Sequence, residues 1–206
     1  MVRMKKPWAV VMLAVALLAG CDSVEEVPGN RLPSDFAGLM ALARQGNAAA
    51  EYNVAVMYLT GNGTACDERA GAEWMAKAAL DGDVDAQFNL AAMYDKGLGV
   101  PKSVLDSLKW YRIAAENGQV KAQFNLGLCY YRGIGVTRNL EKAVLWFEKA
   151  ARAGDMKAQY RMGDCCYVGF GIPKDRDAAI AWYRKSAAQG CQEARDRLKE
   201  LGKKFQ

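Results

Sequence analysis

The sequence has 206 residues, of which 51% are hydrophobic and 25% are charged, with a formal net charge of +5 at pH 7. These values are ordinary for a globular protein and allow one domain with a proper core. The sequence contains no histidine, which excludes Ser-His-Asp and Cys-His catalysis and removes the commonest zinc ligand. Without the first 20 residues, 25 of the 28 basic residues stand against all 23 acidic ones, so we see no electrostatic case for nucleic-acid binding.

Residues 1–20 have the pattern of a secretory signal. Arg3, Lys5 and Lys6 precede an apolar run from Trp8 to Ala19, which is shorter than the roughly 20 residues that a membrane-spanning helix needs. The run ends in Leu-Ala-Gly-Cys at residues 18–21, which resembles a bacterial lipobox. In that family of signals the cysteine is lipidated and becomes the first residue after cleavage. We therefore expect a lipid anchor at Cys21, the alternative being a secretory signal that ends by chance in a cysteine.

Residues 21–33 contain Pro28, Gly29 and Pro33 and no apolar periodicity, so we interpret them as the anchor and a flexible tether. Cys21 would attach the mature protein to the periplasmic side of the cell envelope, with the lipid bilayer as one partner. Asp22 resembles an inner-membrane retention signal, which weakly favours the inner over the outer membrane.

From residue 34 onward the sequence repeats with a period of 36 residues. Three columns carry the repeat: Gly46, Gly82, Gly118, Gly154 and Gly190; Ala50, Ala86, Ala122, Ala158 and Ala194; and Trp74, Trp110, Trp146 and Trp182. A period of this length indicates stacked units that share a continuous core. The identical register of the tryptophans favours packing between repeats over an aromatic ligand site.

Each period predicts two helices. In the second copy these are about 84–94 and 104–116, separated by a Gly-Leu-Gly-Val-Pro turn at 97–101 in which glycine permits positive φ and proline stops the first helix. A helix at 36–45 after the N-cap candidate Ser34-Asp35 begins the array, and a polar helix at 191–201 ends it. We therefore expect ten helices.

The segment 122–136, Ala-Gln-Phe-Asn-Leu-Gly-Leu-Cys-Tyr-Tyr-Arg-Gly-Ile-Gly-Val, resembles the Sel1-like repeat, a relative of the tetratricopeptide repeat. The resemblance continues through Lys142-Ala143 and residues 146–151. It implies an all-α, right-handed αα-superhelical solenoid of four repeats at about 46–81, 82–117, 118–153 and 154–189, with a cap helix at 190–201, within a domain at 34–206. It also implies an adaptor in protein complexes. The first copy departs most from the pattern, because Gly71 is expected to interrupt its second helix.

Catalysis is disfavoured by the residues themselves. None of the five serines begins a Ser-x-x-Lys motif, and the Gly-x-Gly pairs lie between helices with no preceding strand. We therefore expect no enzyme, no cofactor and no metal site, and we place a hydrolase acting on β-lactams or peptidoglycan behind two other hypotheses. These are an adaptor that binds envelope proteins and a structural protein that acts through oligomerisation.

Export makes disulfides possible for the remaining cysteines, Cys66, Cys129, Cys165, Cys166 and Cys191. Their number is odd, and Cys129 and Cys165 lie in one register of successive repeats, where helix axes about 8–10 Å apart disfavour a bridge. We expect small buried or partly buried thiols.

The candidate binding surface is a stripe along the first helices, next to the core positions 50, 54 and 58, which we call the first-helix face. It comprises Ala49, Asn53, Met57 and Thr60; Asp85, Asn89, Met93 and Lys96; Lys121, Asn125, Cys129 and Arg132; and Lys157, Arg161, Cys165 and Val168. Helical solenoids usually expose such a stripe on their concave side. The three asparagines in register suit the backbone of an extended peptide, and the basic residues favour an acidic segment. The alternative is that the asparagines bond between neighbouring helices.

Overall fold

The computed structural model describes residues 32–202, in which ten α-helices and no strand are present. The all-α solenoid with four repeats and helical ends is thereby confirmed. The helices are α2 (Phe36–Ala43), α3 (Ala48–Thr60), α4 (Glu68–Leu80), α5 (Val84–Lys96), α6 (Val104–Glu116), α7 (Val120–Arg132), α8 (Leu140–Arg152), α9 (Met156–Val168), α10 (Arg176–Ala188) and α11 (Gln192–Glu200). The signal sequence and Cys21 lie outside the described residues.

Helix starts are set by side chains that cap the first free N–H groups. From α2 to α10 the residue before each helix accepts a hydrogen bond from a backbone N–H two or three residues further on, as with Asp35 and Gly38 at 2.7 Å. The capping residues of α3 to α10 are Asn47, Asp67, Asp83, Ser103, Gln119, Asn139, Asp155 and Asp175. The N-cap expected near Ser34-Asp35 is therefore Asp35.

The first helix of each repeat ends at a glycine in the left-handed conformation, at Gly61, Gly97, Gly133 and Gly169. Their φ values of 71° to 86° are strained for any residue with a Cβ, which explains why glycine recurs there. The expected boundaries differ slightly from the observed ones: α2 ends at Ala43 rather than Gln45, and α5 extends to Lys96.

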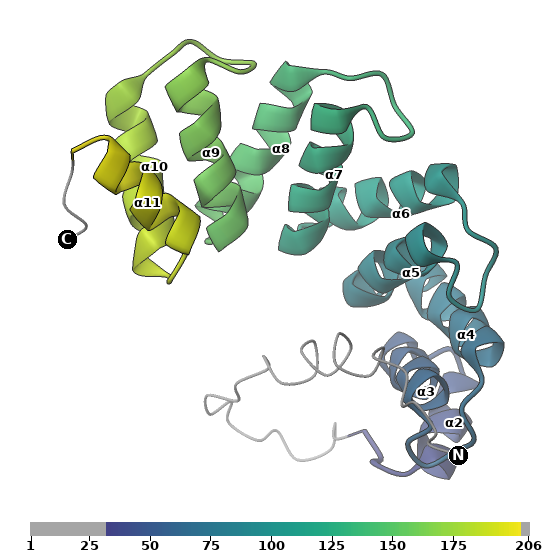
Figure 1. Ribbon diagram of the computed structural model, residues 1–206. Coiled ribbons are helices and arrows are strands. Elements are labelled where there is room, and N and C mark those ends of the chain that lie inside the picture. Colours follow the sequence, from purple (N-terminus) through teal and green to yellow (C-terminus); the bar gives the residue numbers. More distant parts are fainter. Residues whose placement is uncertain (1–31, 203–206) are drawn as a thin grey trace, which may run out of the picture.

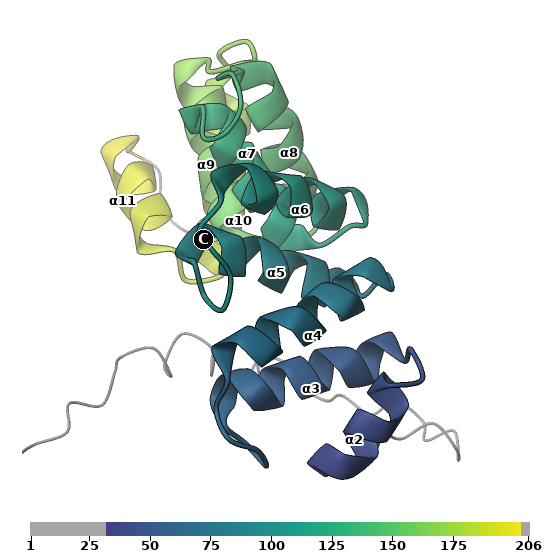
Figure 2. The ribbon, with the colours of Figure 1, turned by 90° about the vertical axis from the view of Figure 1, so that its right-hand side faces the viewer.

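Contacts run mainly between helices that follow one another in the chain, as expected for a solenoid. The pairs succeed each other along a curved path, and α3 and α5 lie nearer its inner side than α4 and α6 (Figure 1). The helix directions also rotate along the array, because α3 and α4 lie across the view of Figure 2 while α7, α8 and α9 stand nearly upright in it.

The tryptophans connect the hydrophobic clusters of successive repeats. Trp74 packs against one cluster within residues 39–57 and a second within residues 55–93. Trp110 packs against this second cluster and a third within residues 91–129. A lysine ammonium lies 3.8–4.4 Å from the ring centre of Trp74, Trp146 and Trp182. Packing between repeats is thus confirmed as a role of these residues.

Small residues on the first helices make room for large ones on the second helices. A Cβ added at Gly127 would lie 2.6 Å from two ring atoms of Phe147. In the first repeat, alanine occupies the position of Gly127, as Ala55, and the smaller Met75 replaces the phenylalanine. The first repeat thus pairs a larger first-helix residue with a smaller second-helix residue than the third repeat does, whereas the second repeat combines Ala91 with Tyr111.

Gly71 does not interrupt its helix, so that prediction was wrong. The helix α4 runs through it without a break, and Gly71 is buried where α3 approaches closely. A Cβ at this position would lie 2.7 Å from Leu59 Cγ and 3.2 Å from the carbonyl oxygen of Ala55. The glycine is therefore a packing residue in a continuous helix.

Candidate interaction surface

The first-helix face is only partly exposed. Its third position in each repeat is buried, with Met57 8%, Met93 1%, Cys129 9% and Cys165 3% exposed. The expectation that all four positions face outward was wrong at this one. A residue three or four positions from a core residue on a helix also borders the core, and here the neighbouring second helix covers it.

The three asparagines are half-buried and bonded within the protein. The Asn53 amide donates to the carbonyl oxygen of Ala49 at 2.7 Å, and the Asn89 amide donates to the hydroxyl of Tyr52 at 3.1 Å. Tyr52 belongs to the preceding first helix, so Asn89 links two repeats. Burial raises the pKa of Tyr111 to about 12, while a hydrogen bond from Asn125 acts in the opposite direction. These contacts favour the interpretation that the asparagines bond between or within helices.

The basic residues of this face are accessible. Lys96, Lys121, Arg132 and Lys157 are exposed, and the Arg161 side chain is 39% exposed. All but Lys96 lie on α7 and α9, so this part of the face is richer in positive charge than the part formed by α3 and α5, where Asp85 is exposed. The accessible chemistry of the face is therefore cationic toward its C-terminal end.

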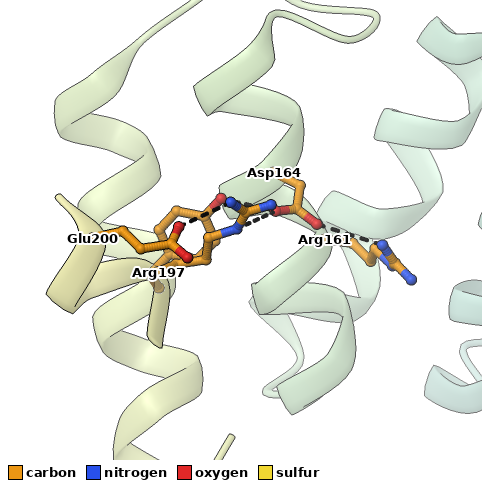
Figure 3. Close-up of polar contacts among 5 residues, drawn as sticks. Arg161, Asp164, Arg197 and Glu200 are labelled. Carbon is orange, nitrogen blue, oxygen red and sulfur yellow. Dashed lines mark hydrogen bonds and ion pairs between the residues drawn. The ribbon is translucent and has the colours of Figure 1, made fainter. Parts of the chain in front are cut away.

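Asp164 organises two arginines at that end. Its carboxylate lies 3.4 Å from the Arg161 guanidinium and 4.0 Å from that of Arg197 on α11, and it accepts a hydrogen bond of 2.8 Å from the Tyr183 hydroxyl. Figure 3 shows Asp164 between the two arginines, with Glu200 on the far side of Arg197. Two arginines stand against the carboxylates of Asp164 and Glu200, so these four residues carry no net charge.

The protonation state of Tyr183 is consistent with this arrangement. Burial, followed by the hydrogen bond to Asp164, raises the pKa of Tyr183 above its ordinary range, so its hydroxyl remains a donor at neutral pH. Sequence reasoning missed the network around Asp164. The available signal was a carboxylate in a column that is otherwise apolar, with Val56, Ala92 and Leu128 in the other repeats.

Four of the five cysteines in the described residues are buried, namely Cys129, Cys165, Cys166 and Cys191, while Cys66 is exposed. Burial raises the pKa of Cys129 to about 11 and that of Cys165 to about 12. Both thiols are therefore protonated at neutral pH and are poor nucleophiles. The expectation of small buried thiols is confirmed for these four residues.

Residues 32–202 contain no group of three or more Cys, Asp or Glu side chains placed to hold a metal ion. Among the helices of the same residues, none combines the length and apolarity required to cross a membrane.

Comparison with known proteins identifies the family. A family model described as Sel1 repeat matches residues 48–83, 84–119, 120–155 and 157–191, and the chain therefore belongs to the Sel1 repeat family. Each match covers one helix pair and the turn that follows it. Sel1 repeat proteins generally mediate protein–protein interactions, and their fold is typically a non-catalytic scaffold.

Solved structures share the architecture. A protective antigen of uropathogenic Escherichia coli with an SLR fold aligns with a TM-score of 0.79 and 33% identity over 82% of this chain and 36% of that one. A Sel1 repeat protein from Oxalobacter formigenes aligns with a TM-score of 0.77 and 34% identity over 81% of this chain and 48% of that one. This chain thus spans less than half the length of either protein. No curated protein matches it.

A weaker likeness extends to a cysteine-rich relative. Cysteine-rich protein B of Helicobacter pylori aligns with a TM-score of 0.50 and 21% identity, over 60% of this chain and 91% of that one. At this identity the likeness concerns the fold alone.

Proposed function

We propose that this protein is a lipid-anchored adaptor of the bacterial envelope that binds an extended, acidic segment of a partner protein along its first-helix face. The observation that carries the proposal is the row of accessible basic side chains on α7 and α9, presented by a four-repeat Sel1 array. Positive residues at regular spacing on one face favour a partner segment that carries carboxylates at a similar spacing.

The asparagines have a supporting role in this proposal. Because Asn89 holds Tyr52 of the neighbouring repeat, its amide is committed to the array in the absence of a partner. The binding energy would come chiefly from Lys121, Arg132 and Lys157, with the Arg161 guanidinium adding to it beside Asp164.

Charge reversal tests the binding face. A variant with Lys121→Glu, Arg132→Glu and Lys157→Glu would be compared with one in which Lys102, Arg112 and Arg184, which are exposed outside this face, are changed to glutamate. Both variants change the net charge equally. Cross-linking in envelope fractions, followed by mass spectrometry of the cross-linked peptides, should show a partner attached to the first-helix face of the wild type and of the control variant. The same cross-links should disappear from the face variant. Equal loss in both variants, or retention in both, would contradict the proposal.

The anchor is tested separately. The proposal predicts that the mature protein stays with membranes after a high-salt wash and that Cys21→Ser releases it into the soluble fraction. Separation of inner and outer membranes on a density gradient then decides between the two, with the inner membrane favoured by Asp22. Release of the wild-type protein by salt would rule out lipid anchoring.

A structural role through oligomerisation is the alternative. Light scattering on the purified mature domain distinguishes the adaptor from the structural protein. An adaptor should be monomeric without its partner, whereas an assembly protein should form a stable oligomer.

A further inference from the structure

One backbone contact recurs in all four repeats. The carbonyl oxygen of Tyr58, Tyr94, Tyr130 or Cys166 accepts a hydrogen bond of 2.8–3.0 Å from the residue that caps the following helix. The backbone therefore holds this position in the same way each time. Only the side chain changes, from a tyrosine in the first three repeats to a thiol in the fourth.

The rings of Tyr58 and Tyr130 pack against the preceding helix as well as against their own helix pair. The ring of Tyr58 lies edge-on to Phe36 with centres 5.3 Å apart, and Tyr130 packs against two hydrophobic clusters, one within residues 91–129 and one within residues 143–198. The Lys142 ammonium lies 5.6 Å from the centre of the Tyr130 ring. Both rings thus lie at the junction between successive helix pairs.

The fourth repeat has a hollow at this position. Its volume is about 620 Å³, within the roughly 300–1,000 Å³ of small-ligand sites, and Cys166 is part of its lining. The apolar side chains of Val144, Met162, Ile172 and Trp182 line it as well. These residues come from α8, α9, α10 and the turn at 169–175. One repeat earlier, Tyr130 packs in clusters with residues of the equivalent helices α6, α7 and α8.

The charges around the hollow balance. Glu148 and Asp175 are matched by Lys174 and Arg176, so the site offers no net attraction to an ion of either sign. A neutral group with an apolar body and a polar tip complements both the apolar lining and the balanced polar rim. A phenol ring has these properties, and the chain itself places one at the equivalent position of three repeats.

We propose that this hollow binds a tyrosine side chain of a partner protein, which takes the place that the chain's own tyrosine fills in the other repeats. None of its lining residues belongs to the first-helix face. The hollow is therefore a second docking point, and it goes beyond the function proposed above. Burial raises the pKa of Cys166, which keeps the thiol neutral and apolar in contact with a ring.

The test uses N-acetyl-tyrosinamide as a probe and N-acetyl-leucinamide as its aliphatic match. The ¹H–¹⁵N NMR signal of the Trp182 indole and the backbone signals of residues 172–178 report on the hollow. We expect a saturable shift with the tyrosine probe and at least about tenfold weaker binding of the leucine probe. No saturable shift, or equal binding of the two probes, would overturn the proposal.

Variants locate the binding. Cys166→Tyr restores the residue of the other repeats and should abolish the shift, whereas Cys66→Tyr makes the same change at an exposed cysteine and should leave it intact. Cys166→Leu, which fills the hollow only in part, provides a second measurement if the tyrosine variant does not fold. Persistence of binding in both Cys166 variants would overturn the proposal. The face variant with Lys121, Arg132 and Lys157 reversed should bind the probe normally, so this inference and the proposed function can fail independently.

Discussion

Glu51 stands at a buried position where the other three repeats have a glutamine. Its counterparts Gln87, Gln123 and Gln159 each donate a side-chain hydrogen bond of 3.1–3.2 Å to a backbone carbonyl eight residues earlier. Glu51 is 3% exposed, and its Oε2 atom has no hydrogen-bond partner. An ionised carboxylate has no proton to donate, so the first repeat lacks this link.

The residue that faces this position from 30 residues further on also differs in the first repeat. Gln87 accepts from Asn117, and Gln159 accepts from Gln189, which lies 30 residues further on in each case. At the corresponding place Glu51 faces Asp81. Burial and then the Asp81 carboxylate raise the pKa of Glu51, because both disfavour its negative charge.

We predict that Glu51→Gln stabilises the protein by about 1 kcal/mol at pH 7, since an unsatisfied buried polar group costs about 1–3 kcal/mol. The raised pKa means that folded Glu51 keeps its proton to higher pH than the unfolded chain does. Its favourable contribution is therefore present below about pH 4.5 and is lost as the pH rises through the folded-state value. The gain from glutamine should consequently grow from pH 4 to pH 7 in thermal unfolding followed by circular dichroism.

Gln123→Glu is the matched reverse change and should lower the melting temperature at pH 7. An unchanged or lower melting temperature of the Glu51→Gln variant at that pH would contradict the account of Glu51.

At the scale of helices, the sequence was sufficient to place the elements. The 36-residue glycine column marks helix ends, and the observed helices α6 and α11 begin and end within one residue of the predicted 104–116 and 191–201. Local patterns carry this information, because a cap or a left-handed glycine acts on the residues beside it. The side-chain pairing between helices was not predictable in the same way. Gly71 looked like a helix breaker until the approach of Leu59 was visible.

The pairing of Gly127 with Phe147 gives an element-scale prediction. Gly127→Ala should destabilise the protein by about 1–3 kcal/mol, although alanine favours helix, because its Cβ would overlap the Phe147 ring. Adding Phe147→Met recreates the combination of Ala55 and Met75 in the first repeat and should recover part of the loss. Urea denaturation of the two single variants and the double variant measures the coupling.

Ala91→Gly serves as a comparison, since it removes a methyl group at the same register without any overlap. Simple additivity of Gly127→Ala and Phe147→Met would show that the two positions do not compensate each other.

On the scale of the whole molecule, the array has no contact-rich pairs between helices distant in the chain within residues 32–202, so stability is transmitted from neighbour to neighbour. The period in the sequence was enough to predict this architecture. The accessible surface was harder to predict, because burial of the third position of the first-helix face depends on how adjacent helices pack. The network at Asp164 likewise depends on α11, which is a departure from the repeat pattern.

The C-terminal helix provides the prediction at this scale. Leu198 is fully buried, and Leu198→Ala should cost about 2–4 kcal/mol through loss of apolar contacts. Because contacts pass between neighbours, native-state hydrogen exchange should show reduced protection in α9, α10 and α11 and little change in α3 to α5.

Leu145→Ala, at a leucine that is 50% exposed, should leave exchange unchanged throughout and serves as the control. A uniform loss of protection in the Leu198→Ala variant would mean that the array unfolds as one unit.

The turning of helix directions between α3 and α9 restricts what can occupy the full length of the inner side (Figure 2). A stiff rod laid along it would diverge from the surface after a short stretch. Only a flexible chain that follows the turn of the solenoid can stay in contact with every helix pair. Any ligand that engages all four units must therefore give up conformational freedom on binding, and shortening it from either end should weaken its hold step by step.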